Sequence, residues 1–477
     1  MLTMNSYRGK KSVLMFPWLG HGHISPFLEL AKKLSNTNLF NIYLCSTPAN
    51  LVSVEKNLNN ITLIELHLDP TLPELPPHLH TTNGLPLHLM PLLKQAFDNS
   101  SHQFSRILQT LKPHLLIYDM IQSWAPVSAA ALGIPSVVFI TTSATMAATM
   151  FHLYTYYSEP GKATPFPFPK IFFRTYEQKH MTEILESSAN NVKDKDRVMG
   201  CVGNSSRIVL VKSFKEIEGD HADYLSRLTG KKVVPVGPLV ADPPCHADLK
   251  QDSVMQWLDT KDTASTVFVS FGSEYFLSSA DLKEIAYGLE SSNVNFIWVL
   301  RFPKSEEEKQ LSEHLPAGFV ERVKDRGLLV QGWAPQTKIL RHKNTGGFVS
   351  HCGWSSVMEA IKFGVPIIAM PMHLDQPVNC RLVVKVGVAL EVVRDGNGLL
   401  LRDRMASVVQ SVVAGKGGIR EKAKEMSVVL REEGEEEIDG AVEELLKLCR
   451  GSRRKALPKT KSESFAFDMC FGVEAQV

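Results

Sequence analysis

The chain lacks the cysteine pattern of a metal-binding or redox protein. Its seven cysteines are an odd number, are scattered from Cys45 to Cys470 and include no CxxC pair. Such spacing offers neither a zinc ligand set nor a redox pair. We therefore expect no metal site, and a reducing compartment, by default the cytosol, suits the free thiols.

Net charge is also nearly absent. The 52 Lys and Arg residues almost balance the 50 Asp and Glu residues, leaving a formal charge of +2 and no basic stripe. Neutralising a nucleic-acid backbone requires clustered positive charge. The composition therefore argues against a nucleic-acid partner.

Uninterrupted apolar runs of membrane-spanning length are missing too. Residues Met120 to Ser158 contain no Asp, Glu, Lys or Arg, but Pro126, Gly133 and Pro135 break this stretch. The N-terminus has a short apolar run without an A-x-A-like cleavage site. We expect a buried helix, strand and helix in the uncharged stretch, with no membrane span and no signal peptide.

What the chain does contain is a repeated alternation of short β-branched runs and amphipathic stretches. This alternation is typical of βαβ units and predicts an α/β fold with parallel sheets and helices on both faces. A Pro- and Asp-rich stretch divides two such series of strands. We predict two Rossmann-like domains at residues 1–240 and 253–440, a linker at 241–252, and a loosely ordered tail at 451–477.

His23 is the first candidate for catalysis. It follows the first predicted strand, in a segment where Ser25 can cap a helix and Pro26 suits its first turn. This places His23 in a loop before a helix N-terminus, where the helix dipole favours the neutral imidazole of a general base. Alternatively, His23 is a loop histidine that binds a neighbouring carbonyl.

Asp119 ends the predicted strand LLIYD. Ligands of open α/β sheets bind beyond the carboxyl ends of the strands, so Asp119 could face the same cleft as His23 and orient its imidazole. Alternatively, Asp119 only caps the following turn. The nearby GHGHIS imitates a dinucleotide GxGxxG but lacks the third glycine, which argues against a nicotinamide cofactor.

The segment from Trp333 to Gln376 combines several groups that suit a nucleotide sugar. An indole can stack on a base, amides can bind its edge, and free amides and hydroxyls at a helix start favour a pyrophosphate. Carboxylate and amide groups after the next strand can bind sugar hydroxyls. Each residue also has a structural alternative: Ser356 and Glu359 can form a capping box, Asp375 can cap a helix, and Trp333 can be core.

These 44 positions resemble the donor-site signature of plant UDP-dependent glycosyltransferases, and residues 12–448 are similar to that family. The resemblance implies a GT-B fold in which the first domain binds the acceptor and the second binds the UDP-sugar. A helix at 441–450 would cross back onto the first domain. The donor would be a substrate, UDP-glucose, and no cofactor or metal would be needed.

The resemblance also implies a role for each matching residue. His23 matches the catalytic base and Asp119 its partner, with inversion at the sugar. The residues that match donor contacts are Trp333, Ala334 and Gln336 for the uracil; Ser273, His351, Trp354, Ser355 and Ser356 for the diphosphate; Glu359 for the ribose; and Asp375 and Gln376 for the sugar, with Gln376 typical of glucose donors.

The chain departs from the family at Ser355, where Asn is common, and at Met370, where Trp often stands. The motifs SHCGWSS and MPMHLDQP, with the segment from Leu75 to Pro91, resemble the branch that extends sugars on flavonoid, apocarotenoid or triterpenoid glycosides. Two alternatives stay open: a glucosyltransferase that acts on an aglycone phenol or carboxylic acid, and a non-catalytic UDP-sugar or glycoside-binding protein.

Overall fold

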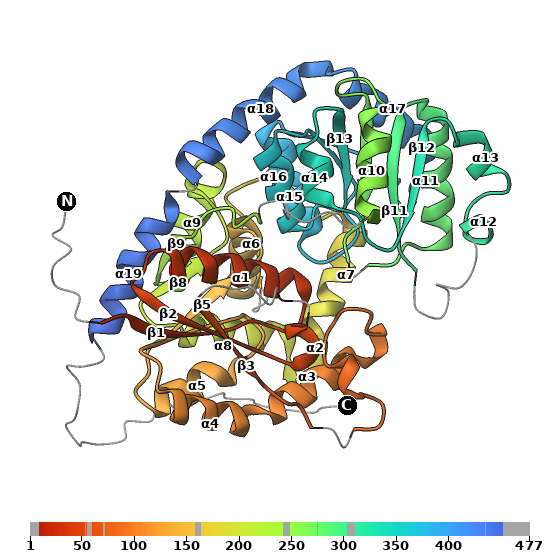
Figure 1. Cartoon of the computed structure of the whole chain (residues 1–477). Coiled ribbons are helices and arrows are strands. Elements are labelled where there is room, and N and C mark those ends of the chain that lie inside the picture. The colour runs from red at the N-terminus through yellow and green to blue at the C-terminus, as the bar shows by residue number, and fades with distance from the viewer. Residues whose placement is uncertain are drawn as a thin grey trace, which may run out of the picture.

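The structure, a computed structural model, describes residues 9–52, 54, 60–69, 72–157, 164–241, 249–273, 275–302, 311–434 and 436–451. Two parallel β-sheets, each flanked by helices, form two lobes (Figure 1). The tail expected at 451–477 lies, from 452 onward, outside the described residues, as do residues 242–248 of the expected linker.

The first sheet has seven strands in the order β3-β2-β1-β4-β5-β8-β9, and all pairs are parallel. Its central strand β1 buries Val13 to Phe16 completely, as expected for a sheet covered on both faces. The strand bounds are β1 (Lys11–Phe16), β2 (Phe40–Ser46), β3 (Ile61–Glu65), β4 (Leu115–Tyr118), β5 (Ser136–Ile140), β8 (Ile208–Val211) and β9 (Lys232–Pro235).

The helices of this lobe include the βα crossovers that cover both faces of the sheet. They are α1 (His21–Asn36), α2 (Pro48–Leu51), α3 (Met90–Asn99), α4 (Ser101–Leu111), α5 (Trp124–Ala131), α6 (Ala144–Tyr157), α7 (Thr175–Glu186), α8 (Asp194–Asn204) and α9 (Lys215–Thr229). Short 3₁₀ turns at Pro77–Leu79 and Leu87–Leu89 and a small hairpin, β6 (Ser188–Ala189) with β7 (Val192–Lys193), complete it.

The second sheet has six parallel strands in the order β12-β11-β10-β13-β14-β15. They are β10 (Thr266–Ser270), β11 (Asn295–Leu300), β12 (Gly327–Gln331), β13 (Thr345–Ser350), β14 (Ile367–Ala369) and β15 (Ala389–Glu391). The helices are α10 (Leu249–Asp259), α11 (Ser279–Ser292), α12 (Leu311–His314), α13 (Phe319–Val323), α14 (Gln336–Arg341), α15 (Trp354–Phe363), α16 (Gln376–Val386), α17 (Arg402–Val413), a 3₁₀ turn at Lys416–Gly418 and α18 (Ile419–Val429).

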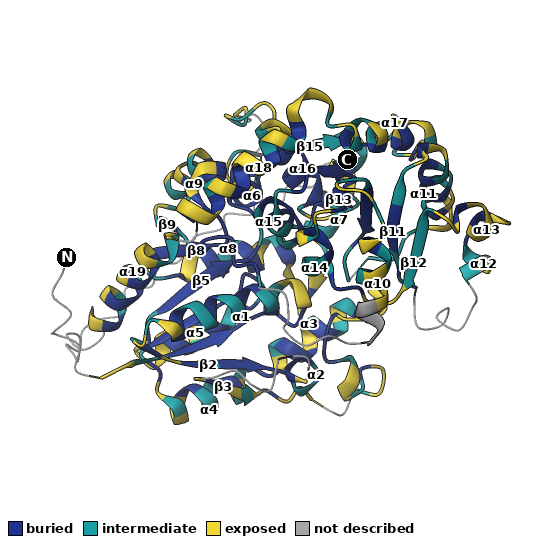
Figure 2. Cartoon of the chain, turned by 45° about the horizontal axis from the view of Figure 1, so that its top comes forward, coloured by how far each residue is buried: buried dark blue, intermediate teal, exposed yellow. Residues whose placement is uncertain are grey.

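A π-turn at Leu430–Gly434 leads from α18 into α19 (Glu437–Gly451), which returns to the first lobe (Figure 1). Ala441, Leu445 and Cys449 of α19 are buried in one cluster with Val13 and Met15 of β1. Figure 2 shows the inner strands of both sheets as buried, with exposed residues on the outer helices. The chain thus starts and ends its described fold on the same sheet.

The predicted α/β class with two Rossmann-like sheets is confirmed. Helix α10 begins at Leu249, inside the stretch expected to be a linker. The uncharged stretch forms α5, β5 and α6. Within the described ranges, no helix combines the length and apolar character that crossing a membrane requires.

The buried histidine of α9 should make the fold sensitive to acid. His221 is 1% exposed, stacks 4.1 Å from Phe168, and neither ring nitrogen has a hydrogen-bond partner among the described residues. Burial lowers the pKa of His221 from 6.5 to about 4. Between about pH 6.5 and pH 4, the unfolded chain therefore binds a proton at His221 that the folded chain does not bind. The free energy of unfolding consequently decreases as the pH falls from about 6.5 to about 4.

We expect His221→Phe to reduce this loss by up to about 3 kcal/mol. Urea unfolding at pH 7 and pH 4.5 would measure it. The matched control, His67→Phe, changes an exposed histidine beside Glu65 and should leave the difference unaltered. An equal loss of stability in wild type and His221→Phe would contradict the prediction.

Candidate active site

The functional side chains lie where the carboxyl ends of the two sheets face each other. Polar contacts join loops that follow strands of different sheets. Thr142, after β5, donates to the Asp375 carboxylate after β14, and Ser143 Oγ donates to Asn379 Oδ1 at 2.6 Å. Since parallel strands direct all their carboxyl ends to one edge, this arrangement brings both sets of loops together.

The start of α1 differs from the prediction. The helix begins at His21 with Gly20 as its N-cap, so His23 lies in the first turn and not in a loop before it. The Gly20 carbonyl accepts from the amides of His23 and Ile24 at 3.0 and 2.9 Å, which closes this turn. Ser25 and Pro26 therefore lie inside the helix, although their sequence is typical of a helix start.

His23 and Asp119 do meet, as predicted. His23 Nδ1 lies 2.9 Å from Asp119 Oδ2 and 3.1 Å from Thr141 Oγ1. Asp119 is fully buried and also accepts from the amides of Trp18 and Met120 at 3.1 and 2.7 Å. The carboxylate thus binds a turn as well as the imidazole. Because Nδ1–H donates to Asp119, the lone pair lies on Nε2, the tautomer that a general base needs.

Three of the donor-segment residues are already bonded to one another. Gln336 Nε2 donates to Glu359 Oε2 at 2.7 Å and to Ser356 Oγ at 3.2 Å. Helix α15 begins at Trp354 with Gly353 as its N-cap and no side-chain cap, so the capping-box alternative for Ser356 and Glu359 is wrong. Glu359 is thereby held one turn into the helix with its carboxylate oriented.

Trp333 and Ala334 follow β12 at the entrance of this segment. The Trp333 side chain is 65% exposed, which excludes the core alternative and leaves an indole that can stack on a planar base. Its ring lies 6.3 Å from that of His21 at the start of α1. Ala334 is buried, so its backbone is what it can offer to a ligand.

His351 follows β13 and packs between two glycines. A Cβ on Gly353 would come within 2.4 Å of its Nε2, and one on Gly272, which has a φ of +81°, within 2.8 Å. Glycine is therefore required at both positions. Burial lowers the pKa of His351 to about 3, so the ring is neutral. Ser273 is half-buried in the same loop as Gly272, after β10.

The first residues of α15 contact the other lobe. Trp354 is 3% exposed and its Nε1 donates to the Lys212 carbonyl at 2.6 Å. Lys212 Nζ donates to Ser355 Oγ at 2.8 Å. Sequence reasoning missed Lys212, although a lysine directly after the apolar strand β8 was a signal that could have found it. The indole of Trp354 thus joins the two lobes. The group that Trp354 contributes to the N-terminus of α15 is its backbone amide.

Asp375 and Gln376 follow β14 and are fixed in different ways. Asp375 accepts from Thr142 and, at 2.9 Å, from Asn379 Nδ2, and its side chain does not cap α16. Burial raises the pKa of this carboxyl. Gln376 Oε1 accepts from the amides of Met372 and His373 at 3.0 and 3.1 Å. The Oε1 atom of Gln376 is therefore held by the backbone, and its amide nitrogen is the hydrogen-bond donor of this side chain.

Glu218 orders the loop between β5 and α6. Its buried carboxylate accepts from the amides of Ala144 and Thr145, at 3.2 and 2.7 Å, and from Ser213 Oγ at 2.6 Å. It thus binds the free amides at the start of α6. This fixes the residues just before α6, including Thr141 beside His23.

Acidic and histidine side chains that could suggest a metal site in the first lobe, such as Asp194 and His80, are bonded to neighbouring protein groups. Asp194 accepts from Lys94, and Lys195 pairs with Glu186 at 2.5 Å. His80 is buried with Nε2 3.1 Å from the Leu75 carbonyl. Across the described residues, no group of three or more His, Cys, Asp or Glu side chains is arranged to hold a metal ion.

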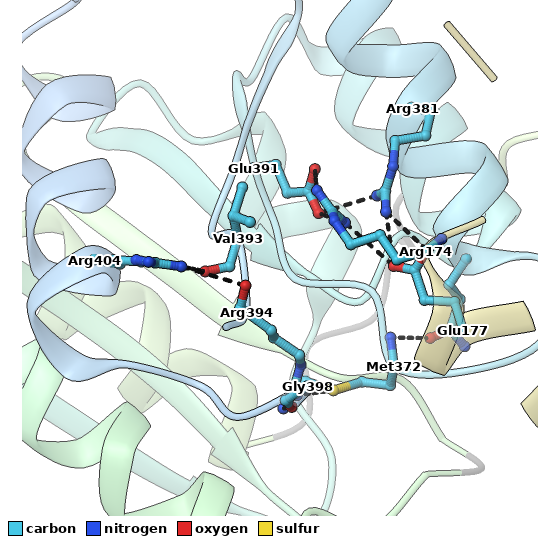
Figure 3. A network of polar contacts seen from close by, with 10 residues as sticks. Arg174, Glu177, Met372, Arg381, Glu391, Val393, Arg394, Gly398 and Arg404 are labelled. Atoms are coloured by element: carbon cyan, nitrogen blue, oxygen red, sulfur yellow. Dashed lines mark hydrogen bonds and ion pairs between the residues drawn. The ribbon is translucent and has the colours of Figure 1, made fainter. Parts of the chain in front are cut away.

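A second contact between the lobes is ionic. Arg174, the N-cap of α7, and Arg381 of α16 both bind Glu177 and Glu391 (Figure 3). Arg174 is bidentate on Glu391 through Nη1 and Nη2 at 2.6 and 3.0 Å, and Arg381 Nη2 donates to both carboxylate oxygens of Glu177 at 2.7 and 2.9 Å. Because Glu177 and Arg381 are at least 90% buried, neither charge can be left without its partner.

Two family models cover most of the chain. "Glycosyltransferase, N-terminal domain" matches residues 10–241, and "UDP-glucoronosyl and UDP-glucosyl transferase" matches residues 233–442. The solved structure of apo UGT2 from Phytolacca americana is 28% identical, with a TM-score of 0.74, over 92% of this chain and 99% of that one.

Three relatives are similar over nearly their whole length. UDP-glucosyltransferase 29 of Panax ginseng is 50% identical over 94% of this chain and 99% of its own. Mogroside IIIx synthase of Siraitia grosvenorii is 49% identical over 92% and 93%. Beta-D-glucosyl crocetin beta-1,6-glucosyltransferase of Gardenia jasminoides is 47% identical over 91% and 98%.

The paired sheets and the structural likeness define an enzyme of the GT-B class, with two Rossmann-like domains facing each other. Within that class, the chain belongs to the plant family-1 UDP-dependent glycosyltransferases. The family predicted from the segment Trp333 to Gln376 is thereby confirmed.

The ionic contact that Arg174 and Arg381 make with Glu177 and Glu391 should contribute strongly to stability. Arg381→Met leaves the buried Glu177 with Arg174 alone, which donates through its amide at 2.7 Å and through Nη1 at 3.3 Å, and we expect a loss of about 3–5 kcal/mol in urea unfolding. Arg322→Met is the matched control, since Arg322 also binds a carboxylate, Glu290, but is 43% exposed. That control should cost less than about 1 kcal/mol, and similar losses for both variants would contradict the prediction.

Proposed function

We propose that this enzyme transfers glucose from UDP-glucose to a hydroxyl on the sugar of an existing plant glycoside. The observation that carries the proposal is the contact of His23 with Asp119 at the edge facing Asp375. In this proposal residues 1–240 bind the acceptor, and residues 253–440 bind the donor. A hydroxyl acceptor that reaches Nε2 of His23 would lie between the two.

The reaction we infer is an inverting displacement. His23 Nε2 takes the proton of the acceptor hydroxyl as its oxygen attacks the anomeric carbon, and the bond from that carbon to the diphosphate oxygen breaks. An α-linked donor then gives a β-glucoside, and the proton leaves from His23 to solvent. General base catalysis contributes about 10²- to 10⁴-fold, and Asp119 holds the tautomer and stabilises the imidazolium that forms.

The leaving UDP would be bound at the start of α15. Free amides at this helix N-terminus and the hydroxyls of Ser355 and Ser356 favour the negative charge that develops on the diphosphate. Since His351 is neutral, it would act here as a hydrogen-bond donor and not as a cation. Trp333, Gln336 and Glu359 would bind the uridine.

Asp375 and Gln376 suit a hexose such as glucose as the transferred sugar. The Asp375 carboxylate accepts hydrogen bonds, and the fixed Gln376 amide nitrogen donates them, which suits neighbouring hydroxyls of one hexose. The preference for a glycoside acceptor is supported by the Gardenia relative, whose name describes a glucosyl substrate and a sugar-to-sugar linkage.

Replacement of the base should separate catalysis from donor binding. We expect His23→Ala to reduce glucosyl transfer by about 10²-fold or more, because the acceptor loses its proton acceptor. UDP affinity, measured by calorimetry, should stay within about twofold of wild type, since His23 is not among the residues proposed to bind the uridine or the diphosphate. Loss of UDP binding in this variant would contradict the assigned role.

The acceptor class can be tested with UDP-glucose and matched panels of aglycones and their monoglucosides, covering flavonoid, apocarotenoid and triterpenoid scaffolds. We expect products from the monoglucosides, with masses and linkages that show glucose added to glucose. Products mainly from aglycones would indicate a phenol or carboxylic acid glucosyltransferase. Tight UDP binding without product from either panel would indicate a binding protein.

A further inference from the structure

Lys212 of the first domain is buried against the start of α15 in the second. It follows β8 and is 1% exposed. Its Nζ donates to Ser355 Oγ at 2.8 Å, and its carbonyl accepts from Trp354 Nε1 at 2.6 Å. One residue of the acceptor domain therefore contacts both of the first two residues of the helix that faces the diphosphate.

The position is electrostatically unfavourable without a bound anion. The N-terminus of a helix carries partial positive charge, so an ammonium group beside it is repelled. Burial lowers the pKa of Lys212 to about 8, which means that the attraction of Glu359 and Glu29 does not offset the loss of water. An ammonium group and a helix N-terminus that converge on one place together favour an anion there.

We propose that Lys212 is a donor-binding residue whose ammonium group pairs with the diphosphate of the UDP-sugar beside Ser355. The inference rests on the proposed function and extends it, because it assigns part of the diphosphate site to the acceptor domain.

The departure of this chain from the family at position 355 fits this assignment. Serine is shorter than the common asparagine and carries no amide N–H to donate to phosphate. The lysine ammonium lies within hydrogen-bond distance of that shorter side chain and provides up to three donors with a full charge. Ser355 and Lys212 together thus replace one asparagine amide.

This assignment has a consequence for the reaction. The diphosphate gains negative charge as the bond to glucose breaks, and a fixed ammonium group stabilises that charge more than it stabilises the intact donor. Because the charge comes from the first domain, donor binding also strengthens the contact between the two domains.

The test compares three ligands that differ only in phosphate. Uridine, UMP and UDP are titrated by calorimetry into wild type and Lys212→Met, which keeps the side-chain length and removes the charge. We expect UDP affinity to fall about 10- to 100-fold, while uridine affinity stays within about twofold. The size of the UMP loss then indicates which phosphate the ammonium contacts.

Lys231→Met is the matched control. Lys231 lies in the same domain, and its Nζ donates to the Ser205 and Ser206 carbonyls at 2.6 and 3.2 Å, away from α15. This variant should change the affinity of none of the three ligands. If Lys212→Met does not fold, as judged by circular dichroism, Lys212→Gln keeps a donor for Ser355 without the charge and should show the same selective loss of UDP.

The outcomes separate this inference from the proposed function. Unchanged UDP affinity in a folded Lys212 variant, or equal losses for uridine and UDP, would overturn the role of Lys212 alone. Failure of wild type to bind UDP at all would overturn the proposed function itself.

Discussion

The hydrogen bond from Thr142 to the Asp375 carboxylate joins the two halves of the active site. The positions of the other side chains in the cleft depend on this contact between the two sheets. It connects a loop after β5 with a loop after β14, each at the carboxyl end of its sheet. Ser143 and Asn379 repeat the contact with buried polar groups. Buried polar groups that lose their partner are costly, so these pairs hold the loops in one register.

Around this contact, some side chains of the site carry charge and others are neutral. Asp119 is a buried carboxylate with three donors directed at it, which suits a partner that becomes positive. His351, in contrast, packs between two glycines, and loss of water around its ring disfavours an imidazolium there. Positive charge near α15 instead comes from the helix start and Lys212. In the proposed reaction, this arrangement suits negative charge on the diphosphate and a transient proton on His23.

The contacts between the domains divide into two kinds. The polar contacts at Thr142, Ser143 and Lys212 join loops at the carboxyl ends of the two sheets, where we propose that the substrates bind. The ionic group of Arg174, Glu177, Arg381 and Glu391 lies on α7, α16 and β15 and contributes to stability (Figure 3). Helix α19 adds an apolar contact by packing on the first sheet. Substitutions in these regions should therefore affect binding and folding separately.

The sequence by itself determined the alternation of strands and helices, and with it the fold class, because apolar periodicity is a local property of the chain. It also identified the family through the segment from Trp333 to Gln376, since the residues of that segment follow one another over a few βα units. Local signals were ambiguous at α1. Ser25 and Pro26 are typical of a helix start, but the helix begins earlier, in the turn that the Gly20 carbonyl closes.

Only the tertiary structure decided which distant groups meet. Thr142 and Asp375 are 233 positions apart, and Lys212 and Ser355 are 143 apart, so no spacing in the sequence predicts either contact. Their partners are selected by how the carboxyl ends of two separate sheets face each other. The same packing decides that His351 is neutral and that Lys212 is buried, because the loss of water around a charge depends on the whole fold.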